Sequence, residues 1–456
     1  MRKVRITAVL LLSFCICLGL LYTGTPASAK GAAAEVKLST GKVVIKPGKK
    51  YRISVENAGT DAKITYSSRN KDIATVSKLG KITGISEGKT TITVIVTKTD
   101  KKGNEKRTTL KCKVKVEAEK TVSIMAVGDA LIHEKILNSG KQADGTYNFD
   151  GLFKFVKKYI SKFDVKIINQ ETIFVNDSNR FGGYPCFGTP NALGDSMMKA
   201  GFNVITCATN HAYDNGARGI KDTVAYWRQF EDTTLMTGIY DNQEDYDTIS
   251  IREYNGIKIA FLNYTMLINS GAKREPYYIR YYRESQAEKE IMYAKKLADF
   301  VVVLPHWGTE YIHEPNAEQK RIAKKMAEAG ADLIIGCHPH VVQPMKVIKT
   351  TDGRKVPCYY SLGNFVSNMY WVKTQVEGMA EVEIVKWNGK TTVKNAEFTP
   401  LINHIYGSGN KFTAILFSDY TSDLCKLHYL NDRFGSGAVT CGRLKEIFNS
   451  IGNDKW

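Results

Sequence analysis

The sequence predicts a chain of several domains, in which an all-β sandwich is followed by an α/β domain. The first observation is a run of short strands separated by turn residues over residues 36–118. The second is a regular alternation of apolar strands and helical patterns from residue 121 onward. The third is the length of 456 residues, which is enough for two or three domains of ordinary globular composition, with 43% hydrophobic and 24% charged residues.

The first 29 residues have the composition of a secretion signal. Arg2, Lys3 and Arg5 form a charged start, residues 8–21 form an apolar core, and Ala27-Ser28-Ala29 matches a cleavage site. The apolar core is about 14 residues long, whereas a membrane span needs about 20. We therefore expect an exported protein that is extracellular or at the cell surface. An uncleaved signal segment would anchor it in the membrane.

The net charge of +18 favours anionic partners. We expect these to be an anionic polymer, the cell wall or a membrane surface, and we expect no nucleic acid. Because the lysines are dispersed rather than grouped in blocks, a solvated cationic surface without a dedicated partner explains the charge equally well.

The cysteines argue against a complete disulfide framework. Two of the nine, Cys15 and Cys17, lie in the signal segment, and the other seven are scattered and odd in number. Cys425 and Cys441 can pair, although their spacing does not require it.

Six short strands are expected in the first module, over residues 43–45, 51–55, 64–66, 73–76, 90–94 and 112–116. Turn residues such as Pro47-Gly48 separate them, which is typical of a β-sandwich. Residues 66–77, 80–85 and 88–94 closely resemble the bacterial immunoglobulin-like group 2 domain, and the resemblance covers residues 36–118. It implies a spacer, with wall or glycan binding as the alternative, and it brings no catalytic residues.

The second region alternates strands and helices. Strands are expected over residues 123–127, 165–168, 204–207, 257–262, 300–304 and 333–335. Helices are expected over residues 152–163, 192–200, 218–230, 284–298 and 317–329. This alternation predicts a largely parallel sheet that is covered by helices.

One polar residue follows each of five of these strands, and a sixth polar residue lies on the turn after the last strand. They are Asp129, Glu171, Asn210, His306, His338 and His340. In open α/β sheets the carboxyl ends of the strands meet at one edge, where ligands bind. Carboxylate, amide and imidazole groups together suit zinc, manganese or iron. The pattern therefore predicts a divalent metal site at this edge.

The order of the motifs resembles that of the CapA family of capsule-synthesis proteins. The motifs are Gly128-Asp129, Asn169-Gln170-Glu171, Thr209-Asn210-His211-Ala212-Tyr213-Asp214, His306-Trp307-Gly308, Gly336-Cys337-His338-Pro339-His340 and Ser361-Leu362-Gly363-Asn364. The resemblance covers residues 122–370. That family is associated with poly-γ-glutamate capsule production and is similar to the calcineurin-like metallophosphoesterases. It implies a four-layer α/β/β/α fold holding one or two divalent metal ions.

The resemblance also implies a role for each site residue. His211 would act as general acid toward the leaving group, and Asp214 would orient it. The metal ligands would be Asp129, Glu171, Asn210, His306, His338 and His340. A water molecule activated by the metal would then attack a phosphoester in line.

One position departs from the phosphoesterase pattern. The first motif there is usually Asp-x-His, whereas this chain has Asp129-Ala130-Leu131. Leu131 cannot bind a metal, and His133 replaces the missing imidazole only if the loop bends. We expect His133 to lie behind the ligands or at the surface, and one metal position to be weak or absent.

The other polar residues give weaker signals. The loop at residues 180–185 places Arg180 either against an anionic substrate or in a surface turn. Rim or packing roles are expected for Glu310, Tyr311 and His313, a site-lining turn for Gly363-Asn364, and structural roles for His404 and His428.

The tail at residues 371–456 extends the second domain. We expect an edge strand over residues 381–385 and a closing helix that buries Leu444, Ile447, Phe448 and Ile451. The tail suggests no function of its own.

Three functions agree with these patterns. The first is an exported metal-dependent hydrolase that acts on phosphoesters. The second is a non-catalytic accessory protein that holds an anionic polymer such as poly-γ-glutamate. The third, carried by the β module alone, is wall binding or adhesion.

Overall fold

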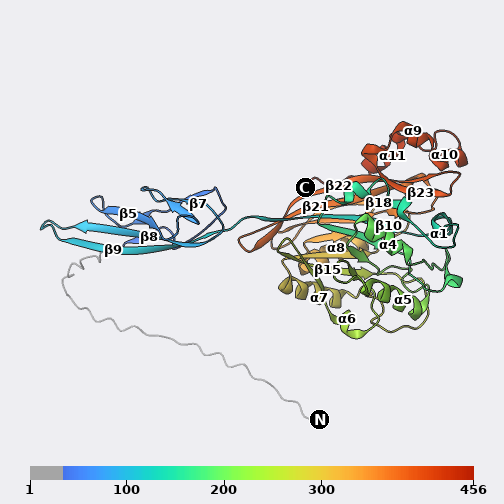
Figure 1. Cartoon of the computed structure of the whole chain (residues 1–456), viewed down its shortest axis with the longest axis horizontal. Coiled ribbons are helices and arrows are strands. Elements are labelled where there is room, and N and C mark those ends of the chain that lie inside the picture. The colour runs from blue at the N-terminus through green and yellow to red at the C-terminus, as the bar shows by residue number, and fades with distance from the viewer. Residues whose placement is uncertain (1–33) are drawn as a thin grey trace, which may run out of the picture. The chain divides into compact units, whose positions relative to one another are not determined.

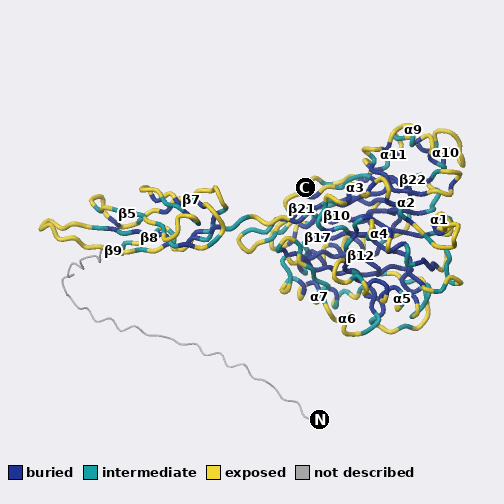
Figure 2. The backbone as a smooth tube through the Cα atoms, viewed as in Figure 1, coloured by how far each residue is buried: buried dark blue, intermediate teal, exposed yellow. Residues whose placement is uncertain are grey.

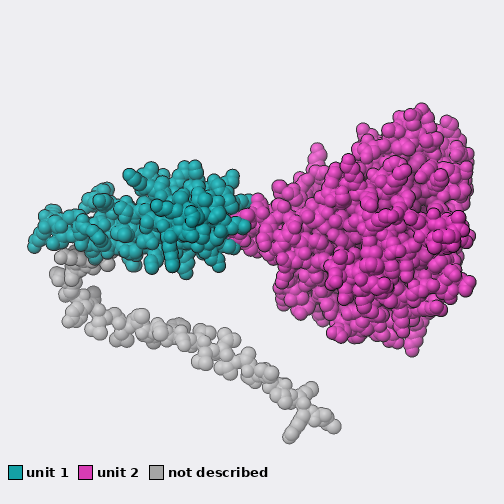
Figure 3. Space-filling model, in the orientation of Figure 1, with its two compact units in different colours: residues 1–116 teal, residues 117–456 magenta. Residues whose placement is uncertain are grey.

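The computed structural model describes residues 34–456, which form two compact units (Figure 1, Figure 3). The first unit ends at Val116 and the second spans Glu117–Trp456. The predicted signal segment lies outside the described residues. Within residues 34–456, no helix combines the length and apolar composition that a membrane crossing requires.

The first unit is the predicted β-sandwich. One sheet has the order β2-β9-β8-β5, with the bounds Lys42–Ile45, Glu105–Val116, Gly88–Thr99 and Lys63–Ser68. The other has the order β3-β7-β6, with the bounds Lys50–Arg52, Lys81–Gly84 and Ala74–Val76. Strands β1 (Lys37–Leu38) and β4 (Val55–Glu56) form a separate pair. Alternate residues such as Val94, Cys112 and Val114 form the core, as a half-buried strand requires.

The second unit contains two sheets. The first has the order β13-β12-β11-β10-β21-β22-β23, with β20 also paired to β10. In that order the bounds are Leu235–Thr237, Val204–Thr206, Val165–Gln170, Lys120–Ala130, Val376–Trp387, Lys390–Tyr406 and Lys411–Leu416, and β20 is Asn364–Val366. Strands β10 to β13 run parallel, whereas β21, β22 and β23 join antiparallel.

The second sheet of this unit has the order β14-β15-β16-β17-β19-β18. The bounds are Ser250–Tyr254, Ile257–Thr265, Phe300–His306, Leu333–Ile335, Lys355–Leu362 and Val342–Lys349. Its four central strands are parallel and its two outer strands antiparallel. The prediction of a largely parallel sheet is therefore correct only for the strands that lead to the predicted site.

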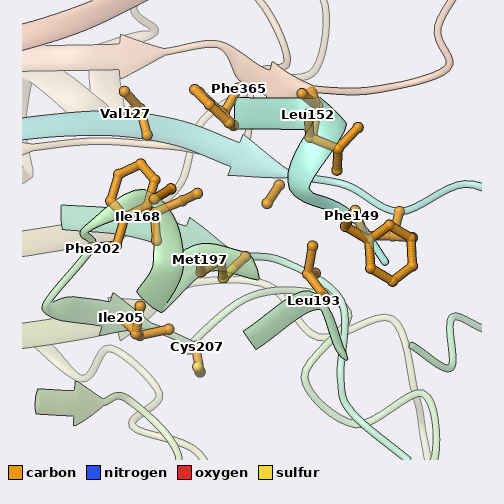
Figure 4. Close-up of a cluster of buried hydrophobic side chains, with 14 of the residues drawn as sticks. Val127, Phe149, Leu152, Ile168, Leu193, Met197, Phe202, Ile205, Cys207 and Phe365 are labelled. Carbon is orange, nitrogen blue, oxygen red and sulfur yellow. The ribbon is translucent and has the colours of Figure 1, made fainter. Parts of the chain in front are cut away.

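Helices cover the outer face of each sheet. Those of the first half are α1 (Glu134–Gly140), α2 (Asp150–Phe153), α3 (Lys157–Ile160), α4 (Ala192–Ala200) and α5 (Gly216–Arg228). They pack on the first sheet through a cluster that includes Ile168, Leu193 and Met197 (Figure 4). Helices α7 (Glu284–Leu297) and α8 (Ala317–Ala329) pack on the second sheet. The short segments η1 (Ser178–Arg180) and α6 (Gln243–Asp247) lie in connections.

A third apolar cluster lies between the two sheets. Ile124 and Ile167 of the first sheet meet Phe261 and Val302 of the second there, and all four side chains are buried. Figure 2 shows the same division, with buried strands inside and exposed segments outside. The order of layers is therefore helices, sheet, sheet and helices, which confirms the predicted α/β/β/α fold.

Two predicted elements were wrong. The single helix expected over residues 152–163 is two short helices, α2 and α3. Between them the amide of Val156 bonds to the carbonyl of Phe153, three residues back, so the i to i−4 ladder of one continuous helix is interrupted there. The expected edge strand at residues 381–385 is the interior strand β21, because the hairpin of β22 and β23 extends the sheet beyond it.

The tail folds onto this extended sheet. It comprises η2 (Val372–Gln375), η3 (Phe417–Asp419), α9 (Ser422–Lys426), α10 (Tyr429–Phe434) and α11 (Cys441–Ser450). Leu444 and Phe448 are buried, as predicted for a closing helix. Cys425 and Cys441 form a disulfide, which the sequence allowed.

His404 and His428 are buried in the tail and each has hydrogen-bond partners. His428 Nδ1 accepts from the Leu430 amide at 3.2 Å and caps α10, and His404 Nδ1 lies 2.7 Å from the Tyr420 hydroxyl. Burial lowers the pKa of His428 to about 4 and that of His404 to about 3, from an ordinary value of 6.5. Both rings are therefore structural and neutral.

We expect the free energy of unfolding to fall as the pH decreases from about 6.5 to about 4. In this interval the unfolded chain protonates both rings, whereas the folded chain excludes the protons. Each histidine contributes a slope of up to about 1.4 kcal/mol per pH unit. Above pH 6.5 both states are neutral, and the contribution is constant. Urea unfolding at a series of pH values measures the slope.

The variant His428→Asn provides the matched comparison. Asparagine keeps an acceptor for capping α10 but does not titrate, so the variant should show a shallower slope than wild type. Equal slopes would contradict the burial of a neutral imidazole at this position.

Candidate metal centre

Six predicted ligand residues converge where the two sheets meet. Asp129, Glu171 and Asn210 come from the ends of β10, β11 and β12 in the first sheet. His306 ends β16 of the second sheet, and His338 and His340 follow β17. All six side chains are buried. The parallel strands therefore place donors from five separate segments in one buried cluster.

Three groups of acidic and histidine donors lie within reach of one ion. In each group the ligand atoms lie within 4.8 Å of one another, and the groups are Glu171 with His306 and His338, Asp129 with Glu171 and His340, and Glu310 with His338 and His340. Because the groups share members, they form one cluster. Glu310, expected at the rim or in packing, therefore lies within reach of the same cluster.

The turn after β17 is strained where it presents its two imidazoles. His338 and His340 have positive φ angles of 99° and 56°, although neither is glycine. Such conformations cost about 1–3 kcal/mol each and persist only where the surroundings impose them. Pro339 between them stiffens the turn, so the strain aims both rings at the carboxylates.

A close backbone approach fixes Asp129. A Cβ atom at Gly128 would lie 1.8 Å from the carbonyl oxygen of Gly363, so only glycine fits there. The Asp129 carboxylate accepts from Asn169 Nδ2 at 2.6 Å and from the His338 amide at 3.2 Å. Its orientation is therefore set by neighbouring strands.

The carboxyl group of Glu171 is buried without a hydrogen-bond partner among residues 34–456, and this burial is the main influence on its pKa. Neither of its carboxylate oxygens has a hydrogen-bond partner within the described residues. Burial, followed by the nearby Asp129 carboxylate, raises the pKa of Glu171 well above its usual range. A cation at this place would compensate both effects.

The three imidazoles differ in charge. Burial lowers the pKa of His306 and brings that of His338 to about 3, so both rings are neutral and have lone pairs to donate. Burial alone would also lower the pKa of His340, but Glu171 and Asp129 raise it to about 9. His340 Nδ1 lies 2.9 Å from Asn364 Oδ1, which leaves Nε2 directed at Glu171, 3.8 Å away.

The unpaired atoms fit a divalent metal. Buried polar atoms almost always have hydrogen-bond partners, and exceptions require an explanation such as an ion. Four such atoms lie in this cluster, namely Glu171 Oε1, Glu171 Oε2, His306 Nδ1 and His338 Nδ1. Mixed carboxylate and imidazole donors suit manganese, iron or zinc. Asn210 Oδ1, which lies 2.8 Å from His306 Nε2, adds an oxygen donor.

His211 and Asp214 form a pair beside the cluster. His211 Nδ1 lies 2.7 Å from Asp214 Oδ2, and the Phe187 ring packs edge-on against the imidazole at 4.6 Å. Asp214 also accepts from the Phe187 amide at 2.9 Å. The carboxylate thus holds the Nδ1 proton and leaves Nε2 as the atom that can exchange a proton with a ligand.

The departure in the first motif has a structural consequence. Leu131 is buried at the cleft wall. His133 belongs to none of the candidate ligand groups within the described residues. Its Nδ1 lies 3.3 Å from the Asn368 amide and its ring packs on Phe187. His133 therefore lines the cleft and does not replace the missing imidazole.

A cleft of about 970 Å³ opens from this cluster. The buried side chains of His340, His211 and Asp214 line it, and the exposed residues Glu310, Tyr184, Trp371 and Phe434 line its rim. Arg433 of α10 also lines it, with its guanidinium 4.5 Å from the Tyr370 ring centre. No ion pair within residues 34–456 includes Arg433, whose guanidinium lies over the Tyr370 and Phe434 rings, so its N–H donors are available to an anionic ligand.

Sequence reasoning missed three contributors. Asn169 belongs to one of the sequence motifs but was given no role, although it follows an apolar run as the predicted metal ligands do. Arg433 and Phe434 come from the tail, where no pattern pointed to the cleft.

Two residues that the sequence suggested do not join the cluster. Arg180 was a candidate for binding an anionic substrate, but it donates a hydrogen bond to the Asn215 carbonyl at 3.0 Å and belongs to the loop structure. His313 bonds to the Val342 carbonyl and lies outside the ligand groups.

Comparison with known families agrees with this architecture. The model described as "Bacterial capsule synthesis protein PGA_cap" matches residues 123–369, more than half of the chain. The chain belongs to this family. A second family model, described as "Bacterial Ig-like domain (group 2)", matches residues 32–106.

Two curated relatives belong to capsule synthesis by their names. "PGA biosynthesis protein CapA" of Bacillus subtilis (strain 168) is 30% identical over 302 residues, which cover 64% of this chain and 74% of the relative. "Capsule biosynthesis protein CapA" of Bacillus anthracis is 30% identical over 289 residues, covering 61% and 67%. Among solved structures, the calcineurin-like phosphoesterase YfkN from Bacillus subtilis matches with 15% identity and a TM-score of 0.39, covering 62% of this chain and 90% of that one.

We expect the purified full chain, loaded with Mn²⁺ and desalted, to retain metal, and Asp129→Ala and His338→Ala to lose most of it. Each substitution removes a donor of the buried cluster, so metal affinity should fall by at least about 10–100-fold, the loss seen when only a supporting residue is removed. Elemental analysis of the protein measures the content.

His313→Ala is the matched control, because His313 lies on the connection between β16 and α8, which also carries Glu310, but outside the ligand groups. It should retain wild-type metal content. Equal trace amounts in wild type and in all three variants would contradict a metal centre.

Proposed function

We propose that this chain is an exported protein of capsule-polymer synthesis with a metal-dependent site that hydrolyses phosphoesters. The observation that carries the catalytic part is the cluster of four buried polar atoms without partners, beside an ordered His–Asp pair. Export rests on the composition of residues 1–29. The link to a capsule polymer, with poly-γ-glutamate as the candidate, rests on family membership and on the names of the relatives.

The chain's residues divide the chemistry between them. A divalent ion held by Asp129, Glu171, Asn210 and the three histidines would supply Lewis acidity and a water molecule of lowered pKa. His211 Nε2 donates a proton to the departing oxygen, while Asp214 holds the ring in position. Asn169 and Asn364 keep Asp129 and His340 oriented through their hydrogen bonds.

Arg433 and the aromatic rim select the substrate. An arginine stacked on Tyr370 offers several N–H donors in a fixed plane, which favours carboxylate or phosphate groups. Because Arg433 lines the same cleft as His340, a substrate with a second anionic group beyond the reacting phosphoester is favoured.

One observation favours a second candidate function. Leu131 stands where phosphoesterases usually carry a histidine, and His133 does not take its place, so the donor set lacks one imidazole. A non-catalytic accessory protein would use the same cleft to hold an anionic polymer during assembly or export. The two functions make different predictions for the metal-loaded chain: a hydrolase turns over a phosphoester, whereas an accessory protein does not.

We expect His211→Asn to lower kcat by about 10²–10⁴-fold on a phosphodiester with an alkyl leaving group. The loss should be much smaller with a p-nitrophenyl leaving group, which departs as a stable anion without a proton donor. Steady-state kinetics of the Mn²⁺-loaded chain on both substrates provides the comparison.

Two controls accompany this measurement. His211→Asn should keep wild-type metal content, and His313→Asn should keep wild-type kcat. The same loss on both substrates would contradict the role of His211 as a proton donor. No turnover of either substrate by the metal-loaded wild type would support the accessory function instead.

We expect Arg433→Ala to raise KM for a phosphodiester that carries a second carboxylate or phosphate, with little change in kcat. Hydrogen bonds to a charged group contribute about 1.5–3 kcal/mol, so KM should rise about 10–100-fold. Lys426→Ala makes the same charge change on α9, away from the cleft, and should leave KM unchanged. Equal KM values for the two variants would remove Arg433 from the binding site.

A further inference from the structure

Most of the net positive charge of the described residues lies in the smaller unit. Residues 34–116 contain 20 Lys and Arg against 7 Asp and Glu, a net charge of +13. Residues 117–456, with about four times the length, contain 40 against 39 and are nearly neutral. The charge of the described chain is therefore a property of the Ig-like module.

Strand register gathers part of this charge on one face. In the sheet β2-β9-β8-β5, alternate residues face away from the core. The outward basic residues are Lys42, Lys63, Lys89, Arg107, Lys111, Lys113 and Lys115, which we call the lysine face. Threonine and serine occupy most other outward positions. The only acidic residue on this side, Glu105, lies at the hairpin end and pairs with Arg107 at 2.9 Å.

Like charges lie directly opposite each other at one point on this face, where Lys42 of β2 is paired in register with Lys113 of β9. Like charges in directly opposed positions destabilise a sheet. Within residues 34–456, Lys42, Lys89, Lys111 and Lys113 form no ion pair. Folding of the module therefore does not explain this arrangement, whereas binding of anions does.

We propose that the lysine face binds a linear polymer that carries a carboxylate on each repeating unit. Lys111, Lys113 and Lys115 repeat every second residue along β9, about 7 Å apart, and neighbouring strands add lysines about 5 Å to the side. A single small anion cannot reach several of these positions, but a chain with regularly repeated charges can. The choice of carboxylate rests on the proposed function in capsule synthesis; the site itself does not.

The test is binding of the full-length chain to fluorescently labelled poly-γ-glutamate, measured at several salt concentrations. The variant Lys42→Gln/Lys111→Gln/Lys113→Gln removes three charges from the lysine face. The control Lys49→Gln/Lys71→Gln/Lys78→Gln removes three exposed charges of the same module from other positions. All substituted side chains are exposed, and thermal melts confirm that both variants fold.

We expect the lysine-face variant to bind about tenfold more weakly at low salt, as three weak ion pairs together would give, and to depend less on salt. The control should change affinity by less than about threefold. The same three lysine-face substitutions should weaken binding by the same factor when they are made in Asp129→Ala, which separates this inference from failure of the metal site.

Three results would overturn the proposal. Equal weakening in the two triple variants would mean that net charge, not this face, attracts the polymer. Tighter binding of polyphosphate or of duplex DNA at equal charge concentration would exclude a carboxylate polymer as the preferred occupant. Absence of salt-dependent binding by wild type would exclude the surface altogether.

Discussion

The structure of the second unit depends on holding two buried carboxylates, Asp129 and Glu171, next to three buried imidazoles. Removing a charge from water costs several kcal/mol per ion, even after relaxation. Strand ends from two sheets, a glycine that permits close contact at residue 128 and a strained turn around Pro339 impose this proximity. A cation bound among these donors would offset that cost.

Much of this unit was predictable because parallel strands obey simple rules. Asp129, Glu171, Asn210, His306 and His338 could be brought together from their position after apolar strands alone, since the carboxyl ends of such strands share an edge. The strands that lie buried on both faces, such as β16, were recognisable as apolar runs. The four-layer order came from the family resemblance, because nothing in a strand pattern tells one sheet from two.

Other features were beyond sequence reasoning for physical reasons. Strand β21 was expected at an edge because its neighbours β22 and β23 pair by long-range hydrogen bonds that no local pattern encodes. The contribution of Arg433 to the cleft depends on how the tail folds back on the sheet, and Glu310 approaches the imidazoles only through the loop after β16. The lysine face was hidden because lysines that look dispersed along the chain become neighbours when β2, β8 and β9 pair.

The disulfide between Cys425 and Cys441 brackets helix α10, the element that presents Arg433 to the cleft. One covalent bond in the periphery thereby tethers a wall of the cleft. Forming it requires the oxidation of two thiols. Protein produced in a reducing cytosol would carry the complete donor cluster with an untethered cleft wall, so the order of that wall would depend on the redox history of the preparation.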